Sequence, residues 1–171
     1  MSAELARIFD ATPLSAFCLV GRLDLLEALF ADRAQWTIEV YDEIVRGVAD
    51  TPALSDVLSA SWLTEPIRSL AVVEIERTRF ALGGKSRDRR HLGEAASIVV
   101  AKTHGYVVAV DDRDATRLAQ ARGLGTTTTP AILRECVHAG ILSASEAHDL
   151  RYAMIDGHDR RLPRLGIGDL S

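Results

Sequence analysis

Apolar residues recur along the chain in two patterns. Short, unbroken apolar runs are typical of buried strands, and apolar residues spaced three or four positions apart are typical of helices that bury one face. Residues 106–110 form the most continuous run, with β-branched and aromatic side chains and no polar alternation. This run therefore predicts a strand in the middle of a sheet, buried on both faces.

Weaker patterns predict further strands. Residues 5–9 are short and apolar, are interrupted by Arg7 and end at Asp10. The remaining predicted strands are short, and the last of them is expected at a sheet edge: they cover residues 36–40, 62–64 and 125–129.

Most of the other segments show helical spacing. Thr12 is a good helix cap and Pro13 suits a first helical turn, so we expect a helix directly after them. Glycines such as Gly21 and Gly105 mark helix ends. The predicted helices cover residues 14–20, 23–30, 40–48, 53–60, 69–82, 94–104, 113–122, 130–139 and 145–154.

Strands that alternate with helices predict an α/β fold with a helix-flanked central parallel sheet. The length of 171 residues fits one domain of ordinary size. We expect this domain to cover residues 1–155, followed by a flexible tail, residues 156–171, that is rich in Gly, Arg and Pro. The polar segment 83–90 predicts an exposed loop inside the domain.

Composition narrows the class of protein. Hydrophobic residues make up 47% of the chain and charged residues 26%, which is typical of a globular protein. No apolar run approaches the ~20 residues that span a bilayer. The first residues lack a positive cluster followed by an apolar stretch, so we expect a cytoplasmic protein that does not bind membranes.

Charge and cysteine usage exclude further classes. A net charge of −4 argues against a purely electrostatic nucleic-acid binder, so any contact with nucleic acid should be local. Cys18 and Cys136 lack the paired spacing of a zinc site or a disulfide framework, and we interpret both as core residues. The five histidines show no helical pairing typical of zinc hydrolases.

Acidic residues follow the two clearest strands. Asp10 comes after residues 5–9, and Asp111 and Asp112 come after residues 106–110. Ligand sites in open α/β sheets lie beyond the carboxyl ends of the strands, so these carboxylates should meet there if the two strands are neighbours. Clustered carboxylates repel each other unless a cation such as Mg²⁺ or Mn²⁺ neutralises them.

Each acidic residue also has a simpler interpretation. Asp10 could serve as a helix cap or turn residue. Glu94 stands at a predicted helix start, where the helix dipole favours a negative charge. Glu43 lies within a predicted helix and could be an ordinary solvated side chain.

Four segments in order resemble the motifs of the PIN-domain family, over about residues 7 to 140. Residues 9–14 (Phe-Asp-Ala-Thr-Pro-Leu) resemble its opening, and residues 40–44 resemble its helix with a glutamate. Residues 92–95 (Leu-Gly-Glu-Ala) and 110–114 (Val-Asp-Asp-Arg-Asp) resemble its later acidic motifs. No single motif is specific, but the four together in this order are.

The resemblance implies a three-layer α/β/α nuclease that uses Mg²⁺ or Mn²⁺ and cleaves RNA. It often implies the toxin of a VapBC-type toxin-antitoxin pair, so RNA, an antitoxin protein and a second copy of the chain are expected partners. Carried over by position, the catalytic quartet is Asp10, Glu43, Glu94 and Asp112, and Thr12 matches the hydroxyl residue that follows the first aspartate. Asp10, Glu94 and Asp112 would hold the metal, and Glu43 would orient or deprotonate a water molecule.

Two departures from the family pattern affect this interpretation. Ala95, Ala96 and Ser97 follow Glu94, where this branch of the family commonly has a second glycine and another acid. The double aspartate leaves open whether Asp111 or Asp112 is the metal ligand, although Asp112 aligns better.

Two surfaces could bind partners. Lys85, Arg87, Arg89 and Arg90 could contact the phosphate backbone of RNA, or could form a solvated loop. The apolar side chains of residues 23–30 could form a dimer or antitoxin interface, or could belong to the core.

Two other functions stay open. An aspartate after the first strand also resembles the haloacid-dehalogenase phosphatases, but these have a second aspartate two residues on, where this chain has Thr12. A PIN-like module that binds RNA or protein without cleavage is the second alternative, and the reduced acidity after Glu94 supports it.

Overall fold

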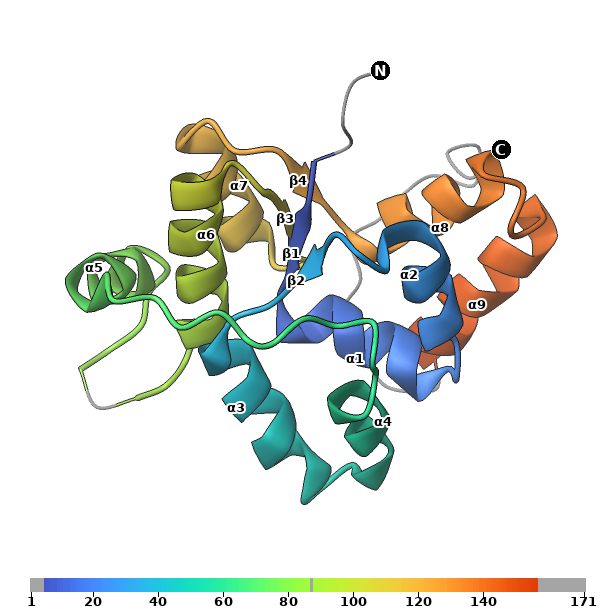
Figure 1. The fold of residues 1–171 in the computed structure, drawn as a ribbon, viewed down its shortest axis with the longest axis horizontal. Helices are drawn as coiled ribbons and strands as arrows, with labels where there is room; N and C mark the ends of the chain where they lie inside the picture. The colour runs from blue at the N-terminus through green and yellow to red at the C-terminus, as the bar shows by residue number, and fades with distance from the viewer. Residues whose placement is uncertain (1–4, 87, 157–171) are drawn as a thin grey trace.

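The computed structural model describes residues 5–86 and 88–156. The sheet in these residues has four parallel strands in the order β2-β1-β3-β4, with helices on both faces (Figure 1). This arrangement confirms the predicted helix-flanked parallel sheet and its three-layer α/β/α architecture. The strands are β1 (Arg7–Phe9), β2 (Ala34–Gln35), β3 (Val107–Ala109) and β4 (Thr126–Thr127).

Side chains from the two central strands alternate between two hydrophobic cores. Phe9 and Ala109 belong to one core, and Ile8 and Val108 belong to the other. In register, Phe9 of β1 stands opposite Ala109 of β3. The alternation follows from the two-residue period of a strand, and burial of both faces explains why residues 106–110 contain no polar position.

The first core is covered by helices from both ends of the chain. It takes side chains from α1 (Ala11–Leu19), α2 (Leu23–Phe30), α3 (Ile38–Val48), α4 (Ser55–Leu58), α8 (Thr129–His138) and α9 (Ala144–Asp156). The second core is covered by α5 (Val72–Ala81), α6 (Leu92–His104) and α7 (Arg113–Ala121).

The predicted strand at residues 36–40 is wrong, because a helix cap lies inside it. The Oγ1 atom of Thr37 accepts a hydrogen bond from the backbone N–H of Val40 at 3.3 Å. The helix α3 begins at Ile38, directly after Thr37. The strand β2 lies just before this segment. The predicted strand at residues 62–64 is also wrong: the nearest strand-like contact is an isolated parallel bridge between Thr37 and Ile67.

The helix boundaries differ from the predictions at three places. Asp10, and not Thr12, caps α1, because its Oδ2 atom accepts a hydrogen bond from the N–H of Thr12 at 3.4 Å. The predicted helix at residues 53–60 is divided into the 3₁₀ turn η1 (Pro52–Leu54) and α4. The predicted helix at residues 69–82 begins later, at the start of α5.

The apolar side chains of α2 pack inward. Leu25, Leu26 and Phe30 are buried in the first core, so this face of the helix belongs to the interior and does not form an exposed patch. The last described helix ends at Asp156, and the rest of the predicted tail lies outside the described residues. None of the described helices is long and apolar enough to cross a membrane.

Candidate functional site

The acidic residues that follow β1 and β3 lie at the same edge of the sheet. Strands β1 and β3 are neighbours, and the backbone N–H of Asp10 donates a hydrogen bond to the carbonyl oxygen of Ala109 at 2.9 Å. Asp111 and Asp112 come two and three residues after the last residue of β3. The expectation that the carboxyl ends of these strands meet is therefore confirmed.

Asp10 is a buried carboxylic acid with one unsatisfied oxygen. The residue is 3% exposed, and its Oδ1 atom has no hydrogen-bond partner among the described residues. Burial raises the pKa of this carboxyl well above its ordinary value of 3.8, and repulsion from Glu94 and Glu43 raises it further. A buried charge with an unpaired oxygen is costly, so the arrangement favours either protonation or a bound cation.

Gly93 of α6 lies beside the carboxylates of Asp10 and Glu43. A Cβ atom at Gly93 would stand 3.0 Å from the Oε2 atom of Glu43 and 3.1 Å from the Oδ1 atom of Asp10. These two oxygens therefore border the same small space, which glycine leaves open. A side chain at this position would occupy it.

Glu43 and Glu94 complete a group of three carboxylates. Glu43 projects from α3, and burial of its carboxyl together with repulsion from Glu94 raises its pKa. Glu94 stands in the first turn of α6, and its side chain is only 18% exposed. Three members of the predicted quartet, from three different elements, thus act electrostatically on one another.

Asp111 has a structural role. It is 7% exposed, its Oδ1 atom accepts a hydrogen bond from the N–H of Thr129 at 2.7 Å, and its Oδ2 atom accepts one from the Thr129 hydroxyl at 2.6 Å. Both oxygens therefore tie the end of β3 to the start of α8. The sequence did not reveal this pairing, because nothing local to Asp111 indicates a partner 18 residues away.

Asp112 caps the next helix. Its Oδ1 atom accepts a hydrogen bond from the N–H of Ala115 at 2.8 Å, and α7 begins at Arg113. The residue is partly exposed, whereas Asp111 is buried. Of the two aspartates, Asp112 is thus the one whose carboxylate lies nearer to solvent.

The residues predicted to bind substrate have different positions. Thr12 lies in the first turn of α1, and its backbone N–H donates the hydrogen bond by which Asp10 caps this helix. The side chain of Arg89 is 59% exposed and lies 3.8 Å from the Oδ2 atom of Asp42 on α3. The side chain of Arg90 is 62% exposed and donates to Asp88. Arg87 lies outside the described residues.

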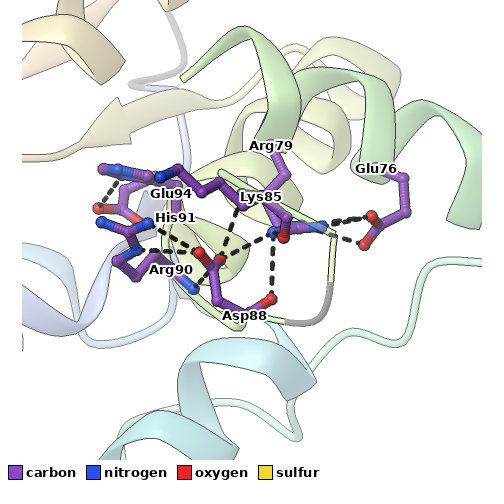
Figure 2. Close-up of polar contacts among 7 residues, drawn as sticks. All are labelled: Glu76, Arg79, Lys85, Asp88, Arg90, His91 and Glu94. Carbon is purple, nitrogen blue, oxygen red and sulfur yellow. Dashed lines mark hydrogen bonds and ion pairs between the residues drawn. The ribbon is translucent and has the colours of Figure 1, made fainter. Parts of the chain in front are cut away.

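The loop that carries these arginines is held by a pair that the sequence analysis missed. Arg79, at the end of α5, is 3% exposed and donates to the Oδ1 atom of Asp88 at 3.1 Å and to the carbonyl oxygen of Lys85 at 2.9 Å (Figure 2). We call Arg79 and Asp88 the loop clamp. The only indication of this pair in the sequence was that Asp88 stands within a basic segment.

The oxygen ligands of Asp10 and Glu43 suit the chemistry of a hydrated hard cation, not that of a closed metal cage. Within residues 5–86 and 88–156, no group of three or more His, Cys, Asp or Glu side chains is placed so that it could hold a metal ion. Mg²⁺, however, is commonly held by one or two carboxylates while it keeps several water molecules. The unpartnered Oδ1 of Asp10 and the open space at Gly93 fit such a cation.

Comparison with known proteins gives one match. A family model described as PIN domain matches residues 6–165. No curated protein and no solved structure matches the chain.

The raised pKa of Asp10 predicts a pH dependence of stability in metal-free protein. The stabilisation from protonated Asp10 is fully present below its unfolded pKa, near 3.8, and is lost as the pH rises through the higher native pKa. Asp10→Asn stays uncharged and keeps the cap, so it should be more stable than wild type at pH 7. A difference of about 1 kcal/mol would raise the melting temperature by about 2–4 °C.

Thermal unfolding in EDTA from pH 4 to 8 measures this effect. The matched control is Asp32→Asn, because the Asp32 side chain is 91% exposed. Equal melting temperatures of wild type and Asp10→Asn across the range would contradict the assignment.

The bonds of Asp111 predict a structural defect on truncation. Asp111→Ala leaves the N–H and hydroxyl of Thr129 without their partner, so we expect a loss of about 2–4 kcal/mol of stability. Asp112→Ala removes one helix cap and should cost about 1 kcal/mol. Chemical denaturation in EDTA compares the two variants, and a smaller loss for Asp111→Ala would be inconsistent with this role.

Proposed function

Because the chain belongs to the PIN-domain family, whose members are generally nucleases, we propose that it is a metal-dependent endoribonuclease that hydrolyses RNA phosphodiester bonds. The observation that carries the proposal is the buried carboxyl of Asp10, which has an unpartnered oxygen and lies beside two further acids. A buried carboxyl group with an unpaired oxygen costs stability and is not required to form the fold. A site for a divalent cation, by contrast, requires carboxylate oxygens that are free to bind the ion.

The acidic residues divide into metal ligands and a general base in this proposal. Asp10, Glu94 and Asp112 would hold Mg²⁺ or Mn²⁺, and Asp112 is favoured over Asp111 because both oxygens of Asp111 accept hydrogen bonds from Thr129. The cation, when bound, lowers the pKa of a coordinated water molecule and stabilises negative charge on the phosphate.

Glu43 orients the attacking water molecule and accepts its proton. Its pKa is raised by burial and by Glu94, which makes it a better base than an ordinary surface glutamate. The water oxygen forms a bond to phosphorus, the bond from phosphorus to one ribose oxygen breaks, and that oxygen takes up a proton. Thr12, which follows Asp10 by two residues, contacts the substrate in this proposal.

A non-catalytic module that binds RNA or protein is the second candidate. Ala95 and Ala96 reduce the negative charge next to Glu94, and among the described residues no group of three His, Cys, Asp or Glu side chains is placed so that it could hold a metal ion. A role as the toxin of a toxin-antitoxin pair, with an antitoxin partner, stays a prediction from the family resemblance.

Calorimetric titration with Mn²⁺ and cleavage of a single-stranded RNA test the proposed nuclease. Wild type should bind Mn²⁺ and cleave only when the metal is present, and Asp10→Asn should lose both properties while it stays folded. Asp32→Asn is again the control, because it makes the same chemical change at an exposed position.

The outcomes separate the two candidates. Full cleavage by Asp10→Asn would rule out the assigned site. RNA binding without Mn²⁺ binding or cleavage would favour the non-catalytic module.

The exposed side chain of Arg89 predicts a contact with the RNA backbone. Arg89→Ala should weaken RNA binding for all sequences and lower the slope of log affinity against log salt by about 1, as expected for one phosphate contact. Arg77→Ala is the control, because the Arg77 side chain is 74% exposed on α5. Fluorescence anisotropy with an RNA probe in EDTA measures both slopes; an unchanged slope for Arg89→Ala would exclude the contact.

A further inference from the structure

His91 has an unusual backbone conformation directly before α6, the helix that carries Gly93 and Glu94. Of the non-glycine residues that the structure describes, it alone has a positive φ, at 62°. It is the N-cap residue of α6, and its carbonyl oxygen accepts a hydrogen bond from the N–H of Ala95 at 3.0 Å. A left-handed conformation is strained for a residue with a Cβ, and such strain often marks functional positions.

The imidazole of His91 faces Glu94. Its Nδ1 atom is buried, lacks a hydrogen-bond partner within the described part of the chain, and lies 3.5 Å from the Oε1 atom of Glu94 (Figure 2). This distance is slightly longer than a good N–H···O hydrogen bond. A shift of a few tenths of an ångström would therefore let a protonated Nδ1 donate to the carboxylate.

The loop clamp holds the chain that leads to His91. The Oδ1 atom of Asp88 accepts hydrogen bonds from the backbone N–H groups of Lys85 and Arg90, at 3.4 and 3.2 Å, in addition to its bond with Arg79. Arg90 is the residue before His91. The buried guanidinium of Arg79 thus holds Asp88, which in turn holds the backbone directly before His91.

We propose that His91 is a positioning residue that directs the carboxylate of Glu94 toward the metal site, and that the loop clamp keeps His91 in the conformation required for this. A donor that binds one oxygen of a ligating carboxylate restricts its rotation and turns the other oxygen toward the cation. This inference rests on the proposed function, because Glu94 needs an orientation only if it binds a cation.

Two substitutions distinguish the effect of the His91 side chain from the effect of its backbone conformation. Glycine adopts positive φ without strain and removes the imidazole, so His91→Gly keeps the helix start and loses the donor. Asparagine also tolerates this conformation, and its side-chain nitrogen is as many bonds from Cβ as the Nδ1 of histidine. His91→Asn therefore restores a donor at the same place.

Mn²⁺ titration of wild type and both variants tests the inference. His91→Gly should unfold near the wild-type temperature in EDTA, yet bind Mn²⁺ roughly 10-fold or more weakly, the usual effect of losing a group that orients a ligand. His91→Asn should recover most of this affinity. The Mn²⁺ concentration for half-maximal RNA cleavage should shift in parallel, with the saturated rate little changed.

The other outcomes overturn the inference in distinguishable ways. Wild-type affinity in His91→Gly would show that His91 serves only as a helix cap, and equal losses in both variants would exclude a donor role. Both results leave the proposed nuclease intact, whereas absence of Mn²⁺ binding by wild type would remove the proposed function itself. If His91→Gly does not fold, His91→Ala replaces it in the comparison with His91→Asn.

Discussion

The burial of the Asp10 carboxyl beside Glu43 and Glu94 is the constraint around which this edge of the molecule is organised. A carboxylate that is removed from water and faces two further acids is destabilised, as its raised pKa shows. The surrounding residues fit this arrangement. Gly93 leaves room beside the oxygens, and the N–H of Thr12 gives Asp10 one hydrogen bond while its second oxygen stays open.

Helix N-termini partly offset the repulsion. Asp10 and Asp112 are the N-cap residues of α1 and α7, and Glu94 lies in the first turn of α6. Each of these positions carries a partial positive charge from the peptide dipoles and free N–H groups. The fold therefore tolerates several acids at one sheet edge, and the simple interpretation of Asp10 as a helix cap holds together with its place in the acidic group.

The sequence predicted those features that depend on residues close to one another along the chain. The buried strand at residues 106–110 and the acids that follow β1 and β3 could be read from local patterns, and parallel pairing followed from the alternation of strands and helices. Residues 36–40 were assigned to the wrong element because the side chain of Thr37 decided between strand and helix. The loop clamp and the Asp111 bonds escaped prediction because their geometry exists only after distant segments pack.

The pairing of β1 with β3 also determines when the acidic group can assemble during synthesis. Phe9 stands opposite Ala109, so a growing chain has released the first ten residues from the ribosome long before their partner strand exists. Glu43 and Glu94 also precede β3 in the sequence, so they emerge in between. A nascent chain thus carries Asp10, Glu43 and Glu94 before it contains the strand that pairs with β1, so the end of β1 that holds Asp10 gains its partner late in synthesis.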